Sequence, residues 1–394
     1  MIERRTFITA GAGLVATLGV GSHSSSGAAG ASADQASGRI VIDALGGIDN
    51  PNSYRDPSEK AGDRPDPAEV DPRVLSDLKM SGVSAINVTL GYVAGPAEPF
   101  EKSVNDVADM DTRIRTYPDH FLKVFAADDI LEAHRTGRVG IIYGFQNAAM
   151  MGDDADRVTT FARLGVRVIQ LTYNVANKLG DGSMVPENRG LTDFGREVVA
   201  ELNANDVLVD LSHSGEQTCL DAIEASTSPI AISHTGCRAL ADLPRNKTDN
   251  ELKRLADRGG VVGIYFMPFL RVEGQPHARD VVDHVVYALK VCGEDHVGIG
   301  TDGSVTTVDD LDKYRDYIAK EVARRKAAGI GAKGETAEVL PLIPDMRGPH
   351  EFDLLAGHLA ARGISERVVD KILGGNFLRL MGEVWSGRAG TEPS

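Results

Sequence analysis

Short apolar runs rich in β-branched residues alternate with segments of helical spacing along most of the chain. The apolar runs are continuous, which is typical of strands buried on both faces of a parallel sheet. Eight strands are predicted, at residues 39–44, 83–90, 139–145, 166–172, 207–211, 229–233, 260–266 and 296–301. Apolar residues spaced three or four apart predict helices between them, at 67–80, 127–135, 155–164, 193–203, 215–225, 249–258 and 279–291.

Eight strands alternating with helices in one domain favour the α/β class and a closed (β/α)₈ TIM barrel. The alternative is an open, doubly wound sheet that binds a dinucleotide. No GxGxxG motif follows the first strand, which weakens that alternative. We therefore expect a single barrel domain over residues 34–386.

Three regions depart from this alternation. Residues 49–71 are rich in Pro, Asp and Asn and predict a loop over the barrel mouth. Residues 306–347 follow the last strand as an insertion with a charged helix at 311–326. Residues 351–379 are helical in pattern with a final turn at Gly374-Gly375, and 387–394 are expected to be a disordered tail.

The N-terminal residues 1–33 have the pattern of a twin-arginine signal peptide. Arg4-Arg5 precedes a weakly apolar run, Ala10 to Val20, and a small-residue stretch ends at Ala31-Ser32-Ala33. The run is too short for a permanent transmembrane helix. We expect export by the twin-arginine machinery to the periplasm or the extracellular space.

Charge and cysteine content narrow the function further. The formal net charge is −15 and no basic stripe occurs, so a nucleic-acid partner is not expected. Cys219, Cys237 and Cys292 lie in or beside apolar or helical segments without CxxC spacing. They are interpreted as small core residues and not as a disulfide framework or a zinc knot.

One βαβ unit, residues 206–234, carries the strongest candidate chemistry. Its two strands end at Ser212-His213 and at Ser233-His234. Parallel neighbouring strands end at the same edge of the sheet, so both imidazoles should leave that edge together. In a barrel this edge holds the active site, and a pair of imidazoles there suits zinc.

Other strand ends add polar groups to the same edge. Asp302 could complete a three-ligand site or act as a general base on a metal-bound water, and Gln146 could add a neutral oxygen. Arg245, after the sixth strand, could bind a substrate carboxylate or phosphate through two hydrogen bonds. Tyr173 could bond to a substrate oxygen. Purely structural roles are alternatives at this point: Asp302 as a residue of a turn, and Tyr173 as a residue that only packs against its neighbours.

The chain resembles the membrane (renal) dipeptidase family of zinc metallopeptidases, within the amidohydrolase-like barrels. The resemblance runs from about Ile40 to Met381. The segments that carry it are 190–192, 210–213, 233–235, 244–246, 298–302 and 371–377. It implies a barrel of the metal-dependent hydrolase type, two zinc ions bridged by a glutamate and a water, cleavage of dipeptides, and a homodimer.

The chain departs from this family at several expected ligands. Leu45 and Gly47 stand where the family has His-x-Asp, and Gln146 stands at the bridging glutamate. Tyr173 stands at the substrate-binding histidine. The resemblance retains His213, His234, Asp302 and Arg245. Asp43 or Asp49 could replace the lost pair, although neither keeps the spacing.

The lost ligands lead us to expect one zinc ion instead of two, held by His213, His234, Asp302 and Gln146. The leading interpretation is an exported dipeptidase-like metallohydrolase that cleaves an amide bond in a small carboxylate-bearing substrate such as a dipeptide. Asp302 and Gln146 would be catalytic, and Arg245 and Tyr173 would bind the substrate. The alternatives are a non-hydrolytic enzyme, such as an isomerase or lyase or one that matures a secreted metabolite, and a catalytically silent ligand-binding barrel.

Overall fold

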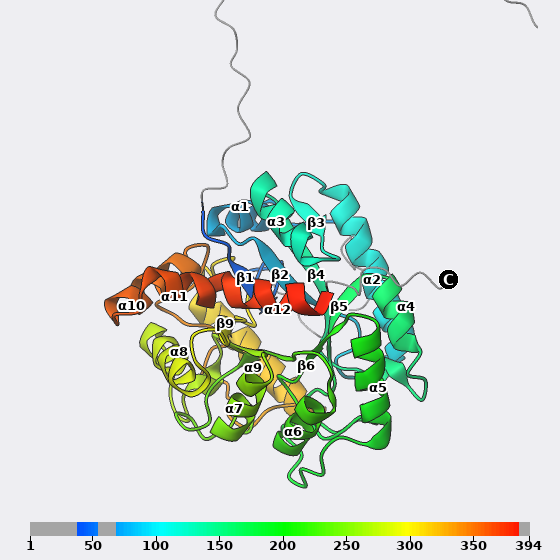
Figure 1. The fold of residues 1–394 in the computed structure, drawn as a ribbon. Helices are drawn as coiled ribbons and strands as arrows, with labels where there is room; N and C mark the ends of the chain where they lie inside the picture. Colours follow the sequence, from blue (N-terminus) through cyan, green and yellow to red (C-terminus); the bar gives the residue numbers. More distant parts are fainter. Residues whose placement is uncertain (1–37, 54–67, 386–394) are drawn as a thin grey trace, which may run out of the picture. The chain divides into compact units, whose positions relative to one another are not determined.

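A barrel of parallel strands forms the centre of the computed structural model, which describes residues 38–53 and 68–385 (Figure 1). In barrel order the strands are β1 (Ile42–Gly46), β2 (Ala85–Leu90), β4 (Val139–Phe145), β5 (Val166–Gln170), β6 (Leu208–Asp210), β7 (Ala231–Thr235), β8 (Val261–Ile264) and β9 (Val297–Ile299). Each pairs with its neighbour in parallel, which confirms the predicted α/β barrel. The predicted signal peptide 1–33, the tail 387–394 and the middle of the loop 49–71 lie outside the described residues.

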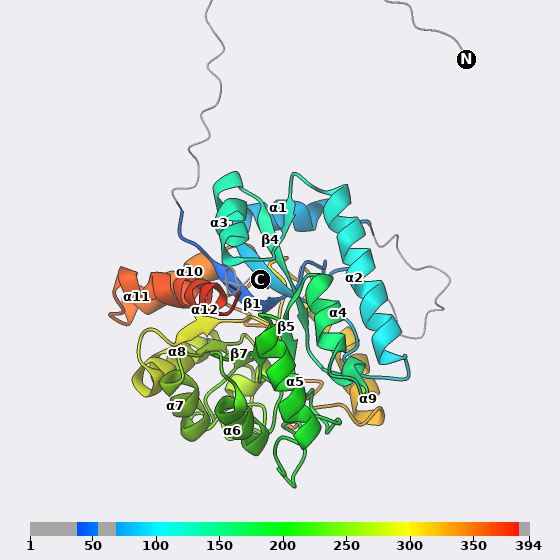
Figure 2. The ribbon, with the colours of Figure 1, turned by 45° about the vertical axis from the view of Figure 1, so that its right-hand side comes forward.

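Helices surround the strands on the outside, as the oblique view shows (Figure 2). They are α1 (Pro72–Ser81), α2 (Pro99–Thr116), α3 (Ala127–Thr136), α4 (Arg157–Arg163), α5 (Asp193–Ala204), α6 (Glu216–Ala225), α7 (Asp249–Asp257) and α8 (Ala278–Cys292). Several begin at side-chain caps: the Thr248 hydroxyl accepts a hydrogen bond from the Glu251 backbone, and the Glu251 carboxylate accepts one from the Thr248 backbone. In the part of the chain that is described, no helix has both the length and the apolar character to cross a bilayer.

The segment between β2 and β4 is richer in structure than the sequence predicted. It contains α2 and the three-residue strand β3 (Phe121–Lys123), which pairs with β4. Pro99 lies in the first turn of α2, and the Glu98 carboxylate caps it by accepting from the Glu101 backbone at 2.6 Å. The missed helix buries only one narrow face, including Val107 and Met110, so its apolar pattern is weak.

The bottom of the barrel is closed by the last helix. Inward-facing residues of the strands, among them Ile42, Ile142 and Leu208, pack in one cluster with Phe377, Leu380, Met381, Val384 and Trp385 of α12 (Asn376–Trp385). In Figure 1 this helix crosses in front of the strands. It leaves the opposite end of the barrel for the site.

The predicted final turn at Gly374-Gly375 is wrong. The tail runs through α10 (Glu351–Ala361), α11 (Glu366–Asp370) and a π-helical turn, Lys371–Gly375, directly into α12. A side chain at Gly374 would meet the Ile40 carbonyl oxygen at 2.4 Å. The glycine therefore permits close approach to the segment before β1 and does not end the helix.

The seam between β1 and β9 is joined by a side chain as well as by backbone. Asp43 of β1 accepts hydrogen bonds from the Thr301 backbone at 2.8 Å and the Thr301 hydroxyl at 2.6 Å. The Asp302 backbone donates to Leu45 O at 2.8 Å, and Gly47 donates to Gly303 O at 2.7 Å. These bonds connect the first and last strands of the sheet and place Asp302 at the mouth.

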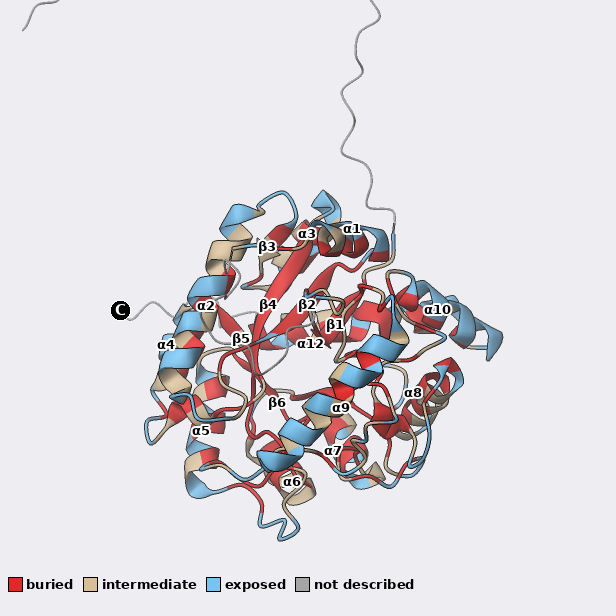
Figure 3. Cartoon of the chain, turned by 180° about the vertical axis from the view of Figure 1, so that it is seen from behind, coloured by how far each residue is buried: buried red, intermediate tan, exposed pale blue. Residues whose placement is uncertain are grey.

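Between β9 and α10 the chain crosses the mouth of the barrel. This crossing contains α9 (Leu311–Ala327), which lies on the face opposite to α12 (Figure 3). The outer side of α9 is exposed, while Tyr314 and Ile318 are buried beneath it with Val308 and Leu340. The helix therefore roofs the mouth.

We expect Asp43→Ala to lower the free energy of unfolding by roughly 2–4 kcal/mol, because Thr301 loses two buried hydrogen bonds. Asp43→Asn keeps an acceptor oxygen and should cost less. Burial raises the pKa of Asp43 from 3.8 to about 7. The folded chain thus holds more protons than the unfolded chain between these values, and the stability contributed by Asp43 falls as pH rises through this window.

Denaturant titrations near pH 5 and pH 8 measure this effect. Asp43→Asn should flatten the pH dependence of unfolding relative to the native chain. An alanine variant as stable as the native chain would contradict the role of Asp43 in the seam.

Candidate functional site

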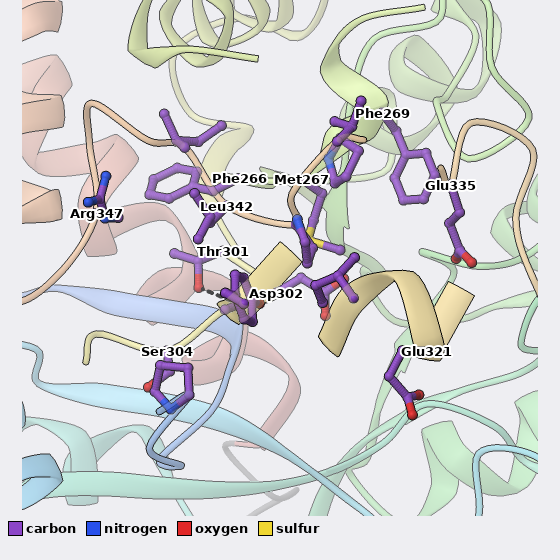
Figure 4. A pocket seen from close by; sticks show the side chains of 18 of the residues that line it. Phe266, Met267, Phe269, Thr301, Asp302, Ser304, Glu321, Glu335, Leu342 and Arg347 are labelled. Carbon is purple, nitrogen blue, oxygen red and sulfur yellow. Dashed lines mark hydrogen bonds between the residues drawn. The ribbon is translucent and has the colours of Figure 1, made fainter. Parts of the chain in front are cut away.

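A cavity of about 350 Å³ lies at the barrel mouth under α9. Its floor comes from strand ends and includes Tyr173, Asn174, His213, Arg245 and Asp302. Its roof is largely apolar and comes from the segment after β9: Val308, Tyr314, Ile318, Val322, Leu342, Ile343 and Met346. Figure 4 shows Asp302 near the centre, with Arg347 on one side and Glu335 on the other.

His213 and His234 come together as predicted. Their Nε2 atoms are 3.1 Å apart, and both side chains are buried. His213 lines the cavity, and His234 lies behind it with no exposed surface. The geometry follows from the parallel register, since both residues stand at the carboxyl ends of adjacent strands.

A buried Asp-Ser network fixes the two strand ends. Asp210 accepts hydrogen bonds from the Ser212 hydroxyl at 2.6 Å and from the Ser212 and Ser233 backbones at 3.0 Å. The Ser233 hydroxyl also donates to Asp210, and the His234 backbone donates to the Ser212 hydroxyl at 3.0 Å. In each Ser-His pair the serine therefore fixes the strand end, and the histidine belongs to the candidate site.

The hydrogen-bond partners define which ring nitrogens carry protons. Asn174 Nδ2 donates to Ile330 O, so Asn174 Oδ1 faces His213 Nδ1 at 2.8 Å and requires a proton there. Ser233 donates to Asp210, so His234 Nδ1 donates to the Ser233 hydroxyl at 2.9 Å. Burial and the charge of Arg245 hold the pKa of both histidines well below the usual value. The two neutral rings thus turn Nε2 lone pairs toward each other.

Arg245 and Asp302 bring opposite charges to the same cavity. Arg245 is 1% exposed, and its Nη1 donates to Ser212 O, while its Nη2 is buried without a hydrogen-bond partner in the described chain. Burial raises the pKa of Asp302 to about 6, although the charges of Arg245 and Arg325 lower it. Asp302 also has a φ of 58°, a left-handed conformation that is uncommon for this residue and is often found at functional sites.

Tyr173 is held by the roof. Its ring stacks on His213 with centroids 4.1 Å apart. Arg325 of α9 donates to the Tyr173 hydroxyl at 3.3 Å and binds Glu335 at 2.8 and 3.0 Å. The roof is thus tied by a mostly buried ion pair to the ring that covers His213.

The remaining candidates do not join this cluster. The Gln146 amide donates to the Thr89 hydroxyl at 2.6 Å, and Gln146 is not among the residues lining the cavity. Asp43 is engaged at the seam, and Asp49 is exposed. Leu45 and Gly47 line a second cavity of about 530 Å³ on the other side of Asp302.

Sequence reasoning missed several residues that shape the site. Asp210, Ser212 and Ser233 form the network under the imidazoles, and the repeated Ser-His pattern was the available signal. Arg325 had no such signal, because its neighbour Arg324 is equally charged, yet Arg324 pairs with Glu321 and its side chain is 52% exposed. Only the fold decides which arginine turns inward.

Two buried imidazoles, a carboxyl with a raised pKa and a buried arginine at the mouth of a (β/α)₈ barrel define the metal-dependent hydrolase class. The family model described as "Membrane dipeptidase (Peptidase family M19)" matches residues 97–330. The chain belongs to this family, which confirms the predicted resemblance.

Individual relatives agree with this assignment. Dipeptidase tcpJ of Claviceps purpurea is 29% identical over 277 residues, 68% of this chain and 56% of its own length. An uncharacterized dipeptidase of Schizosaccharomyces pombe is 32% identical over 225 residues, 54% of each chain. The chain thus spans about half the length of these two curated relatives.

A solved structure is similar over more of its length. An amidohydrolase from Pseudomonas aeruginosa is 32% identical, with a TM-score of 0.72, covering 88% of this chain and 97% of that one. The homodimer expected from the resemblance stays a prediction.

The metal that this family implies fits the imidazole pair only in part. Two nitrogens on one tetrahedral zinc lie about 3.3 Å apart, close to the observed 3.1 Å, and two facing lone pairs would be favoured by a cation between them. Yet among the described residues no group of three or more His, Cys, Asp or Glu side chains is gathered closely enough to hold an ion. Asp302 therefore does not stand as the third ligand in this arrangement, and Gln146 turns to Thr89.

Proposed function

We propose that the protein is a dipeptidase-like hydrolase that cleaves an amide bond in a small substrate with a free carboxylate. The observation that carries this proposal is the unpartnered Nη2 of Arg245, buried in the same cavity as His213 and Asp302. A buried guanidinium with a free donor is a strong partner for a carboxylate. Two of the relatives are named as dipeptidases, which supports the same reaction class.

The residues divide the work as follows. Arg245 binds the carboxylate and orients the substrate on the cavity floor. Asp302, when ionised, accepts a proton from the attacking water and passes it to the leaving amine. The apolar roof keeps bulk water out and accommodates an apolar side chain of the substrate.

The metal part of the proposal is one zinc ion per chain, held by the Nε2 atoms of His213 and His234. When bound, zinc supplies acidity to a water molecule. Asn174 and Ser233 hold the imidazoles in the tautomer that a metal requires. The sites of Leu45 and Gly47 offer no side-chain ligand for a second ion.

We expect the native chain to release free amino acids from dipeptides and to place one oxygen of isotopically labelled water in the new carboxylate. Its rate should rise with pH through about 6, because Asp302 must lose its proton to act as a base. Asp302→Asn should lower kcat by about 10²- to 10⁴-fold and remove this limb of the pH profile.

The outcome separates the proposal from its alternatives. Product without solvent oxygen indicates a non-hydrolytic enzyme. Ligand-induced thermal stabilisation without turnover, unchanged by a chelator, indicates a silent binding barrel.

We expect the purified chain to bind one equivalent of Zn²⁺, measured by calorimetry and by metal analysis after dialysis. His213→Ala should abolish this binding, because one imidazole alone is a poor site. His296→Ala is the control, since His296 directly precedes β9, away from the carboxyl ends of the strands, and its ring contacts Gly260 O at 2.7 Å. Two tightly held equivalents would contradict the one-ion proposal.

We further propose export by the twin-arginine route to the periplasm or extracellular space, supported by Arg4-Arg5 and the small-residue stretch ending at Ala33. We expect a variant with Arg4→Lys and Arg5→Lys to stay in the cytoplasmic fraction of a host with this machinery. Equal export of the two proteins would refute this part.

A further inference from the structure

The cavity contains more unsatisfied polar groups than Arg245 alone. Four buried side-chain atoms that line it have no hydrogen-bond partner in the described chain: Arg245 Nη2, Thr306 Oγ1, Arg347 Nε and Glu351 Oε1. Buried polar atoms are almost always paired, so each exception requires an explanation. A concentration of them around one cavity is explained by a polar ligand that supplies the missing partners.

Glu351 is the most unusual of these groups. It is the first residue of α10 and is 5% exposed. Its backbone donates to Gly348 O at 3.0 Å, but its side chain has no hydrogen bond or ion pair with any residue that the structure describes. Burial first, and then the charge of Asp43, raise the pKa of Glu351 well above its usual value. A carboxyl in this state is costly unless it stays protonated or meets a cation.

Within residues 38–53 and 68–385, no cationic side chain forms an ion pair with Glu351. Arg347 is the neighbouring basic residue on this wall, yet it forms no ion pair with Glu351 and donates instead to Pro344 O. Arg325 is occupied by Glu335, and Arg245 acts on Asp302, His213 and Tyr173. The charge that acts on Glu351 is that of Asp43, which is bonded to Thr301 at the seam. The cavity is therefore cationic near His213 and acidic near the seam.

We propose that Glu351 binds the protonated amine of the substrate, so that the site selects zwitterions with the carboxylate on Arg245 and the amine on Glu351. This rests on the proposed function and adds a specificity-determining residue to it. A volume of about 350 Å³ suits a ligand of dipeptide size. An apolar side chain of the substrate contacts the roof.

The proposal has a proton balance that can be measured. A carboxyl buried without a partner, as Glu351 is, favours its protonated form, whereas an adjacent ammonium group favours the carboxylate. On binding, the neutral acid and the ammonium would form an ion pair and release one proton to the buffer. The N-terminal position of Glu351 in α10 also favours its ionised form. Binding of a zwitterion near neutral pH should therefore release up to one proton per site, and binding of an N-acetylated peptide should release none at Glu351.

The test is calorimetry with Ala-Ala and N-acetyl-Ala-Ala, each in two buffers of different ionisation enthalpy. Asp302→Asn is the background, so that the peptides are consumed much more slowly than by the native chain. Ala-Ala should bind about 10- to 100-fold more tightly than its acetylated form, with proton release. Adding Glu351→Gln should remove both the preference and the proton release and leave N-acetyl-Ala-Ala unchanged.

Asp353→Asn is the matched control, because Asp353 lies in the same first turn of α10 but is exposed. Asp353→Asn should change neither the affinity nor the proton release of either peptide. Glu351→Gln should fold with unchanged or higher thermal stability, because it removes a buried ionisable group without a partner. Equal weakening of both peptides, or an unchanged affinity for Ala-Ala, would overturn the proposal.

The two proposals fail in different ways. If the native chain binds Ala-Ala with proton release but never cleaves it, the hydrolase function falls and the role of Glu351 stands. If the native chain cleaves Ala-Ala and the Glu351→Gln variant has the same KM for Ala-Ala as the native chain, the role of Glu351 is overturned and the hydrolase function stands. If neither Ala-Ala nor N-acetyl-Ala-Ala binds, both proposals are overturned.

Discussion

The buried carboxylate of Asp210 is the constraint on which the site depends. It gathers the hydroxyl and backbone groups of Ser212 and Ser233 and thereby fixes the ends of two neighbouring strands. His213 and His234 follow these serines directly, so their Nε2 atoms lie 3.1 Å apart. Since the anion has no water around it, its hydrogen bonds carry its stabilisation, and small shifts of either strand end are costly.

The mouth of the barrel is asymmetric around this pair. On the side of β6 and β7 lie His213, His234 and Arg245, with Arg245 buried beneath the roof. On the side of β1, Leu45 and Gly47 leave a second cavity in place of ligands, and Asp43 serves the seam with Thr301. The two sides of the mouth therefore differ in chemistry, with imidazoles and a guanidinium on one side and a cavity lined by Leu45 and Gly47 on the other.

The roof links the scaffold to the reaction. Arg325 reaches from α9 to Tyr173, and Tyr173 stacks on His213, so the segment after β9 contacts the imidazole pair through one ring. Tyr173 stands where a family histidine was expected. Its position in the structure is that of a residue that stacks on His213, accepts a hydrogen bond from Arg325 and lines the cavity. The apolar surface that α9 presents to the cavity narrows the choice of substrate side chains.

By itself the sequence determined the class of fold, the eight strands of the barrel and the meeting of His213 and His234. Continuous apolar runs are local signals for buried strands. Residues at the ends of adjacent parallel strands lie close together, so the position of the two histidines at strand ends was enough to predict their contact. It missed α2, whose buried face is narrow, and it ended the last helix at Gly374, where a glycine in fact permits contact with Ile40. Only the tertiary structure decided that Gln146 turns to Thr89, that Arg325 rather than Arg324 faces inward, and that Glu351 lines the cavity. These are orientations of side chains toward distant segments, and they depend on packing between residues far apart in the chain, which no local pattern records.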